Sequence, residues 1–379
     1  MASALPLVDG QARVLDFEIP NDASQDASGG DSGTAYRDII VIGASAGGVE
    51  ATSEIARALP ADFPGAVFVV VHIAPTATSL LPAILTRRGA LPARHPSDGD
   101  PIEPGTIYVA PPDRHLMLER GRVRVVRGPM ENGTRPAVDP LFRSAATAYG
   151  ARVVGVVLSG NLDDGTAGLI AIKRCGGRAI VQDPADALFP GMPQSAIEHV
   201  AVDEVVPLDA IPSAIIATSR EAVHENAPCR NGRLLQREVQ MVEFDEHIFT
   251  PDGPPPLPRG EPSGFTCPNC HGALWEIEEG KLIRYRCRVG HAFSPETLVA
   301  MESEDVEEAL WVAYRSLEES AALARRMEAR SVRHEHAYSA ARFAQHAAEL
   351  ERRAAILRNV LATAPALTAP DAESLLGPA

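Results

Sequence analysis

Asp38-Ile-Ile-Val-Ile-Gly-Ala-Ser-Ala-Gly-Gly48 is the stretch that decides the fold of this chain. Its apolar, mostly β-branched run from Ile39 to Ile42 predicts a parallel strand that is buried on both faces. The small residues after this run predict a tight turn with Ser45 at its apex, followed by a helix over 49–59. The segment also matches the G-x-S-x-G nucleophile elbow, in which small neighbours let a hydroxyl project over a sheet.

Two other interpretations of this turn are a plain strand-to-helix connection and a phosphate cradle at a helix N-terminus. The cradle is disfavoured, because the dinucleotide fingerprint has glycine at the position of Ser45. The motif is short and common, so a catalytic role for Ser45 needs support from elsewhere in the chain.

Strand-like and helical segments alternate from residue 38 to about residue 220. This pattern predicts a doubly wound α/β fold with a mostly parallel sheet and helices on both faces. One antiparallel hairpin is also expected, because Arg120-Gly121 forms a two-residue turn between strand-like segments. The expected strands are 38–42, 66–71, 106–110, 152–158, 178–182 and 201–206, the hairpin strands are 115–119 and 122–127, and the expected helices are 49–59, 139–148, 165–175 and 193–198.

Length, composition and charge limit the class of protein. The 379 residues are 45% hydrophobic and 22% charged, which is typical of a soluble globular protein with more than one domain. No apolar run is long enough for a membrane span and the N-terminus carries no secretory signal, so a cytoplasmic location is expected. The formal net charge of -15 argues against nonspecific nucleic-acid binding, which needs a basic surface.

Changes in composition along the chain predict separate units with a disordered segment at each end. The expected units are a disordered extension (1–35), the α/β domain (36–220), a proline-rich linker (221–263), a zinc-ribbon-like module (264–295), a C-terminal helical hairpin (296–364) and a disordered tail (365–379). The helical region is expected because residues 296–364 contain neither Gly nor Pro.

Two chelating pairs, Cys267-Pro-Asn-Cys270 and Cys287-Arg-Val-Gly-His291, are separated by sixteen residues. Three thiolates and one imidazole at this spacing predict a tetrahedral Zn2+ site, with His271 as a substitute ligand. Four protein ligands leave no open position, so the zinc is expected to be structural and to take no part in catalysis.

The other two of the five cysteines are Cys175 and Cys229. Because the cysteines are few and unevenly placed, the sequence predicts no disulfide framework and favours a reducing compartment. We assign no role to these two residues.

The metal-binding module also carries a local basic face on an acidic protein, formed by Lys281, Arg284, Arg286 and Arg288. This face favours docking to an acidic protein surface over binding of nucleic acid. The helical region has two alanine-rich stripes separated by the polar stretch 330–336, which predicts two antiparallel helices. A packed helical hairpin is favoured. The alternatives are that the helices cover the zinc-ribbon-like module, form an oligomer, or contact a helical receptor.

Three polar side chains follow the ends of separate expected strands. Ser45 follows the first, His72 closes the run 66–71, and Asp164 follows the run 152–158. Ligands of open α/β sheets bind at the carboxyl ends of the strands, and a serine nucleophile needs a base that is oriented by an acceptor. The order Ser, His, Asp differs from that of the α/β-hydrolase fold, so a triad here would sit on a different fold.

Each of these assignments has an alternative. His72 could be a structural histidine, and Asp163 or Asp164 could cap the helix expected from residue 165. The other candidate bases are His95, His115 and His199, none of which closes a buried apolar run.

Six motifs occur in order between residues 38 and 216. They are Ile42-Gly-Ala-Ser-Ala-Gly-Gly48, Val71-His-Ile-Ala-Pro75, Pro104-Gly-Thr-Ile-Tyr-Val-Ala-Pro111, Arg135-Pro-Ala-Val-Asp-Pro-Leu-Phe142, Leu158–Gly165 and Phe189-Pro-Gly-Met-Pro193. Together they resemble the catalytic domain of the CheB family, the protein-glutamate methylesterases of bacterial chemotaxis. The resemblance implies hydrolysis of glutamate γ-methyl esters on chemoreceptors, and deamidation of certain receptor glutamines, without a cofactor for catalysis.

Carried over to this sequence, the resemblance makes Ser45 the nucleophile, His72 the general base and Asp164 the orienting carboxylate. It also implies an oxyanion hole of main-chain N–H groups at Asn161 and Ala46. Two departures concern this hole. The family commonly has Thr where this chain has Ala46, and a Met-Gly pair where it has Asn161-Leu162.

The family's usual architecture places a phosphorylatable receiver domain before the esterase. The 35 or so residues before the α/β domain are too few for one, so the chain resembles the stand-alone members and we expect no phospho-aspartate control in the same chain.

The leading hypothesis is a Ser-His-Asp methylesterase acting on a chemoreceptor-type protein in chemotaxis-like signalling. The alternative is a non-catalytic regulatory or scaffold protein that binds partners through the esterase domain, the zinc module and the helices. The intact Ser45, His72 and Asp164 set favours the enzyme, because a degenerate copy would be expected to have lost a member.

Overall fold

The computed structural model describes residues 35–223, 229, 232–243, 260–279 and 281–363. The extension expected over 1–35, apart from Ala35, and the tail expected over 365–379 lie outside the described residues. So does the segment 244–259, which contains most of the prolines of the expected linker.

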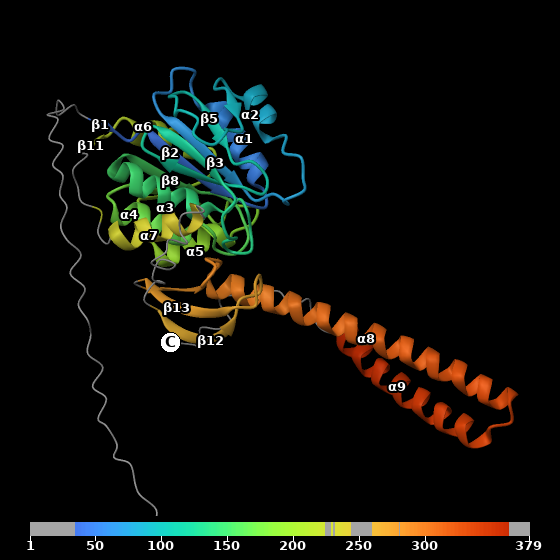
Figure 1. Ribbon diagram of the computed structural model, residues 1–379. Helices are drawn as coiled ribbons and strands as arrows, with labels where there is room; N and C mark the ends of the chain where they lie inside the picture. Colours follow the sequence, from blue (N-terminus) through green and yellow to red (C-terminus); the bar gives the residue numbers. More distant parts are fainter. Residues whose placement is uncertain (1–34, 224–228, 230–231, 244–259, 280, 364–379) are drawn as a thin grey trace, which may run out of the picture. The chain divides into compact units, whose positions relative to one another are not determined.

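A seven-stranded sheet forms the centre of the α/β domain, and every neighbouring pair of its strands is parallel (Figure 1). Its order is β10-β9-β8-β2-β3-β5-β4. The strands are β2 (Ile39–Ala44), β3 (Ala66–Val71), β4 (Ala93–Arg94), β5 (Ile107–Val109), β8 (Val153–Val157), β9 (Arg178–Gln182) and β10 (Glu204–Val206). The chain proceeds in opposite directions from β2 and from β8, so the topological switch point lies between these two strands.

Helices cover both faces of this sheet, and alternate residues of β2 enter two separate cores. Ile39 and Val41 pack with α3 (Val138–Tyr149), α4 (Thr166–Arg174) and α5 (Gly191–His199). Ile40 and Ile42 pack with α1 (Gly48–Ala58), α2 (Leu81–Arg88) and α6 (Ile211–Ser219). Burial on both faces explains the uninterrupted apolar run of this strand. The doubly wound α/β prediction is confirmed.

Short antiparallel pairs lie outside the main sheet. The expected hairpin is present as β6 (His115–Glu119) and β7 (Arg122–Val126), which form a two-stranded sheet of their own. The hairpin packs on α3, because the N–H of Leu118 donates to Ser144 Oγ and Tyr149 donates to the carbonyl of Glu119. A second pair joins β1 (Ala35–Tyr36) to β11 (Ala222–Val223), and a 3-10 turn, η1 (Gly150–Arg152), precedes β8.

Part of the proline-rich linker expected over 221–263 is folded. Residues 232–243 form α7 (Gly232–Glu243), whose Leu235 and Val242 are buried against the α/β domain. Just before it, Cys229 forms a disulfide with Cys175 at the end of α4, so the two cysteines without an assigned role are joined to each other. Leu235, Val239 and Val242 of α7 recur at helical spacing, so the periodicity of this helix is present in the sequence although a linker was expected.

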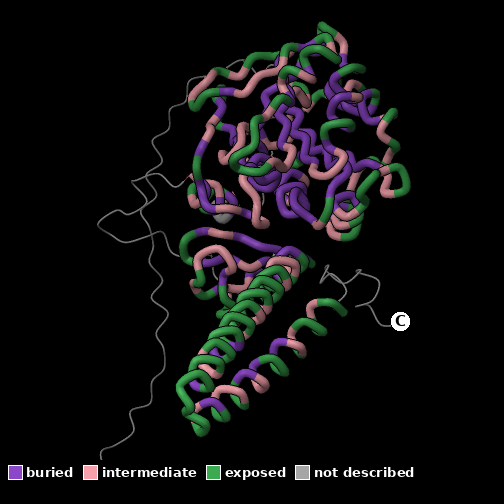
Figure 2. The backbone as a smooth tube through the Cα atoms, turned by 90° about the vertical axis from the view of Figure 1, so that its right-hand side faces the viewer, coloured by how far each residue is buried: buried purple, intermediate pink, exposed green. Residues whose placement is uncertain are grey.

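The C-terminal part contains a four-stranded antiparallel sheet and two long helices. The strands, in sheet order, are β12 (Glu261–Thr266), β13 (Ala273–Glu279), β14 (Leu282–Cys287) and β15 (Ala292–Phe293). The helices α8 (Pro295–Arg333) and α9 (Ala337–Thr363) lie side by side as a hairpin (Figure 1). Figure 2 shows that exposed residues dominate this hairpin, whereas buried ones fill the α/β domain.

Small residues form the seam between α8 and α9. The buried residues along it are Ala321, Ala324, Ala347, Leu350 and Ala354, in agreement with the thin alanine-rich stripes of the sequence. Within the described part of the chain, no helix combines the length and the apolar character that crossing a bilayer would need.

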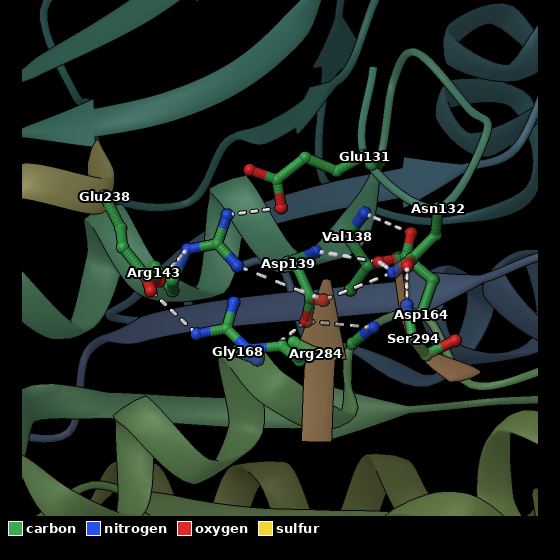
Figure 3. Close-up of polar contacts among 12 residues, drawn as sticks. Glu131, Asn132, Val138, Asp139, Arg143, Asp164, Gly168, Glu238, Arg284 and Ser294 are labelled. Carbon is green, nitrogen blue, oxygen red and sulfur yellow. Dashed lines mark hydrogen bonds and ion pairs between the residues drawn. The ribbon is translucent and has the colours of Figure 1, made fainter. Parts of the chain in front are cut away.

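A cluster of five charged side chains, each at most 5% exposed, joins the α/β domain to the C-terminal sheet: Glu131, Arg143, Glu238, Arg284 and Arg286. Arg286 pairs with Glu131 at 3.2 Å. Arg284 pairs with Glu238 at 2.7 Å, and Arg143 pairs with both glutamates (Figure 3). The expectation that Arg284 and Arg286 belong to an exposed basic face is therefore wrong. The acidic surface that they contact belongs to the same chain.

The arginines of this cluster keep the two glutamates ionised. Burial alone would raise the pKa of Glu131, but the charges of Arg143 and Arg286 outweigh it and lower this pKa to about 2. Burial opposes ionisation of Glu238 in the same way, and Arg284 and Arg143 lower its pKa to about 2. Removal of one partner from such a cluster is costly, because it leaves a buried charge without full compensation.

We expect Arg286→Met to lower the free energy of unfolding by about 3 kcal/mol, because Glu131 would remain buried with one partner fewer. Urea denaturation followed by circular dichroism measures this change. Arg288→Met is the matched control, because Arg288 is exposed on the following turn, and its effect should stay within about 0.5 kcal/mol. Equal stability of the two variants would contradict the importance of the buried cluster.

Candidate active site

The turn after β2 holds Ser45 in a fixed position at the switch point. The N–H of Ser45 donates to the carbonyl of Ser159 at 3.0 Å, and the N–H of Gly48 donates to the carbonyl of Ser45 at 2.9 Å. Gly47 has a φ of 77°, and a Cβ at this position would lie 2.9 Å from Ser159 Oγ. Only glycine satisfies both constraints at low energy, so the turn positions the hydroxyl with little freedom.

His72, directly after β3, lies between Ser45 and Asp164. Its Nδ1 is 3.1 Å from Ser45 Oγ, and its Nε2 is 2.7 Å from Asp164 Oδ2. An ionised carboxylate can only accept a hydrogen bond, so Nε2 carries the proton and Nδ1 is left as the acceptor for the hydroxyl of Ser45. The structure thus brings together the three side chains from the ends of three neighbouring strands.

Asp164 is buried and accepts hydrogen bonds from the start of α3. The N–H groups of Val138 and Asp139 donate to it at 2.6 and 3.2 Å, and Asn132 Nδ2 donates to its Oδ1 at 3.1 Å (Figure 3). Burial raises the pKa of Asp164, but the hydrogen bond and charge of His72, with these donors, outweigh it and lower the pKa below its ordinary value. The carboxylate therefore stays ionised in a dry environment.

The alternative role for this carboxylate, capping the helix expected from residue 165, is not what the structure contains. That helix, α4, has Gly165 at its N-cap, and the N–H of Gly168 in its first turn donates to Asp139 and not to Asp163 or Asp164. Asp164 instead accepts from the first N–H groups of α3, which is a helix from another part of the chain.

Two further buried carboxylates lie beside Asp164. Asp139 accepts from the N–H groups of Gly165 and Gly168, and burial together with the negative charge of Asp164 raises the pKa of Asp139. Asp163 accepts from the hydroxyls of Ser294 at 2.7 Å and Thr297 at 3.1 Å, and burial raises its pKa to about 7.

The candidate oxyanion donors are main-chain groups near Ser45. Within the described residues, no protein acceptor takes the N–H of Ala46 or of Asn161. Gly160 brings the second of these turns against the serine, because a Cβ there would lie 2.9 Å from Ser45 Cβ. The two N–H groups are thus free to donate to a ligand.

The other candidate bases make different contacts. His95 Nδ1 lies 2.9 Å from the carbonyl of Val109, and His199 Nδ1 lies 3.0 Å from that of Ser195. His115 is buried, with its Nε2 on the carbonyl of Pro129. Among the described histidines, only His72 has a hydrogen bond to Ser45.

A second site lies in the C-terminal sheet, where Cys267, Cys270, Cys287 and His291 place their ligand atoms within 4.8 Å of one another. Cys270 Sγ is 3.6 Å from Cys287 Sγ, and His291 Nδ1 is 3.7 and 3.5 Å from the sulfurs of Cys267 and Cys287. Tetrahedral zinc would separate two thiolate sulfurs by about 3.8 Å and sulfur from nitrogen by about 3.5 Å. The donor set and its spacing therefore fit such an ion. The substitute ligand, His271, lies outside the cluster.

The sequence did not identify Asn132 and Ser294 as parts of the site. Asn132 belongs to an Asn-Gly pair with a φ of 49°, so its only sequence signal is that of a turn. Ser294 carries the signature of a helix N-cap, since Pro295 follows it at the first helical position. Neither signal indicates that the side chain lies near Asp164.

Comparisons with known proteins find similar sequences. Residues 40–215 match the family model described as CheB methylesterase. A protein-glutamate methylesterase/protein-glutamine glutaminase of Anaeromyxobacter dehalogenans is 43% identical over 183 residues, which is 48% of this chain and 54% of that protein. One with the same name from Methanosarcina mazei is 35% identical over 219 residues, covering 56% and 60%. The chain therefore spans little more than half the length of these relatives.

One of the matches among solved structures is a crystal structure of the Thermotoga maritima CheB methylesterase catalytic domain. It is 35% identical, with a TM-score of 0.46, and the match covers 48% of this chain and 97% of that one.

Asp163 gives a pH-dependent prediction. Its pKa rises from 3.8 to about 7 on folding, so its contribution to stability is present below 3.8 and is lost as the pH rises through 7. Asp163→Asn keeps an acceptor for both hydroxyls and removes the charge. The stability of the variant relative to wild type should therefore increase between pH 5 and pH 7, by up to about 1.4 kcal/mol per pH unit.

Urea denaturation of both proteins at several pH values measures this difference in unfolding free energy. The contributions of the other titrating groups are the same in both proteins and cancel. A difference in unfolding free energy that does not change with pH would show that Asp163 is ionised in the folded protein at low pH.

Proposed function

Residues 40–215 match the CheB methylesterase family model, and on this premise we propose that the protein is a serine esterase that hydrolyses γ-methyl esters of glutamates in a chemoreceptor-type protein. One observation carries the proposal: the continuous hydrogen-bonded series from Ser45 Oγ through His72 to Asp164. A hydroxyl becomes a nucleophile only when a base can take its proton, and this series supplies the base and its orienting acceptor.

In the acylation step, Ser45 Oγ attacks the ester carbonyl while His72 Nδ1 takes the hydroxyl proton. The imidazolium that forms is stabilised by Asp164, which remains ionised and holds Nε2–H. The N–H groups of Ala46 and Asn161 are suited to stabilise the oxyanion of the tetrahedral intermediate. His72 then protonates the leaving methoxide, so methanol departs and Ser45 carries the glutamyl group.

Water completes the reaction by the same route. His72 takes a proton from the water as its oxygen attacks the glutamyl ester, and returns that proton to Ser45 Oγ as the bond breaks. The products are a glutamate side chain and the free enzyme. A glutamine amide would form the same acyl-enzyme with release of ammonia, which is consistent with the glutaminase named in the relatives.

The alternative function is a regulatory or scaffold protein that binds its partner without turnover. The intact series and its buried acceptor do not favour it, because a carboxylate that only supports the fold has no need of an imidazole and a hydroxyl in line with it. The same substitution at Ser45 tests both functions.

We also propose that Cys267, Cys270, Cys287 and His291 hold one Zn2+ ion. When bound, the ion would link two turns at the same end of the C-terminal sheet, because Cys267 and Cys270 lie in the β12–β13 turn and Cys287 and His291 flank the β14–β15 turn. A small sheet with a limited apolar core gains folding free energy from such an ion. Four protein ligands give it a structural role.

Ser45→Ala should abolish methanol release from receptor membranes whose glutamates carry radiolabelled methyl groups, because no other group in the site can form the acyl-enzyme. His72→Ala should reduce release by at least about a thousandfold. Ser316→Ala, on the exposed face of α8, is the control and should release methanol at the wild-type rate. Equal release by the Ser45→Ala protein would refute the assignment.

Elemental analysis of freshly purified protein should find about one zinc per chain. Cys287→Ser should lower this content and the thermal stability of the C-terminal sheet, because it removes one of the four ligands. Ser substitution of Cys229, which lies outside the ligand set, should leave the zinc content unchanged. Metal-free wild-type protein with an intact sheet would contradict the site.

A further inference from the structure

On the basis of the esterase function above, we propose that the C-terminal metal-binding module positions the catalytic carboxylate, with Asn132 and Ser294 as the positioning residues. The module would then be a working part of the esterase site within the same chain. Three sets of contacts carry this inference: the amide of Asn132, the cap of α8 and the pairing of β15 with the loop that contains Asn132.

The side-chain amide of Asn132 bridges the module and the triad. Its Oδ1 accepts from the N–H of Ser294 at 3.1 Å, and its Nδ2 donates to Asp164 Oδ1 at 3.1 Å and to Asp139 Oδ2 at 3.3 Å (Figure 3). A main-chain N–H can only donate, so Ser294 fixes which end of the amide carries the oxygen. The NH2 group is thereby directed at the two carboxylates, where an oxygen would be repelled.

The cap of α8 holds the residue next to Asp164. Ser294 Oγ accepts from the N–H of Thr297 at 3.0 Å and donates to Asp163 Oδ1 at 2.7 Å. Thr297 Oγ1 donates to the same oxygen at 3.1 Å. Asp163 and Asp164 are consecutive, so the hydroxyl of Ser294 holds the residue next to the catalytic carboxylate. The N–H of Ser294 holds Asn132, which donates to Asp164 Oδ1.

The loop that carries Asn132 runs alongside the last strand of the module. The N–H of Asn132 donates to the carbonyl of Ala292 at 2.8 Å, and the N–H of Ala292 donates to the carbonyl of Met130. Glu131 lies between these residues and pairs with Arg286 of β14. Gly133 is also close to α8, because a Cβ there would lie 2.9 Å from Met301 Sδ.

The ligand cluster lies next to these contacts in the chain. Cys287 follows Arg286, and His291 precedes Ala292. The turn between the two ligands is closed by the N–H of Cys287 on the carbonyl of His291 at 3.0 Å, and Arg286 Nη1 donates to the carbonyl of Gly290 at 2.9 Å. The conformation of the turn from Cys287 to His291 therefore determines the position of β15 and of the Ser294 N–H that follows it. Loss of the metal should release Asn132 from one of its two partners.

The test uses a fluorophosphonate probe, which needs no knowledge of the protein substrate. Ser45 Oγ forms a bond to phosphorus, the phosphorus–fluorine bond breaks, fluoride leaves, and His72 accepts the hydroxyl proton. The labelling rate of the full-length protein therefore reports the competence of the triad, and peptide mass spectrometry identifies the labelled residue.

Asn132→Asp and Asn132→Gly should each slow the labelling of Ser45 by about tenfold or more, because both remove the donor to Asp164. Asp and Gly both tolerate the φ of 49° at this position. Asn132→Asp should also shift the pH profile of labelling to higher pH, because a second negative charge beside Asp164 favours protonated His72. A purely structural role for Asn132 would leave the position of the pH profile unchanged.

Two variants at Ser294 test the module side. Proline has no N–H to donate to Asn132, and its ring suits the φ of -75° at Ser294. Alanine keeps this N–H and loses only the hydroxyl. Ser294→Pro should therefore slow labelling more than Ser294→Ala, and removal of the metal with 1,10-phenanthroline should slow the wild-type protein toward the Pro variant. Ser303→Ala, which alters an exposed hydroxyl of α8, is the control and should react at the wild-type rate.

Two outcomes would overturn the inference, and they differ in what they say of the esterase. Equal labelling rates and pH profiles in wild type, the Asn132 variants and Ser294→Pro would overturn the positioning role and leave the esterase in place. Absence of labelling at Ser45 in the wild-type protein would overturn the esterase function and the positioning role together.

Discussion

The site depends on one interaction, the hold that the first N–H groups of α3 have on the buried carboxylate of Asp164. A desolvated carboxylate would ordinarily take up a proton and could then no longer serve as a hydrogen-bond acceptor for His72 Nε2–H. The helix terminus offsets this cost with aligned main-chain donors and its partial positive charge. Because α3 packs on the face of β2, the same packing that buries the sheet also sets the position of the carboxylate that His72 Nε2 contacts.

Much of the fold and the triad could be predicted because parallel strands impose long-range order. Carboxyl ends of neighbouring parallel strands share one edge of a sheet, so Ser45, His72 and Asp164 could be grouped from strand ends alone. Periodicity was enough for β2, β3, β8 and β9, which are buried on both faces. The same periodicity is present in α7, at Leu235, Val239 and Val242, but the polar and proline-rich composition around it favoured a linker. The disulfide between Cys175 and Cys229 could not be predicted, since a single pair has no spacing signature.

The remaining parts of the site could not be predicted for a different reason. Arg284 and Arg286 have the composition of a solvated surface, and they are buried only because the C-terminal sheet contacts Glu131 and Glu238. Asn132 and Ser294 are 162 residues apart and meet only through this contact. Charge complementarity between distant surfaces of one chain leaves no pattern in a local stretch of sequence, whereas periodic burial does.

The length of α8 has a mechanical consequence. Its 39 residues form one continuous helix of about 58 Å, with Ser294 at one end and the turn to α9 at the other. An α-helix resists bending and stretching over such a distance. A force applied near Arg333 would therefore be transmitted along α8 to Ser294, whose hydroxyl contacts Asp163. Such a force at the far end of the hairpin would act on the two hydroxyls that contact Asp163, next to Asp164.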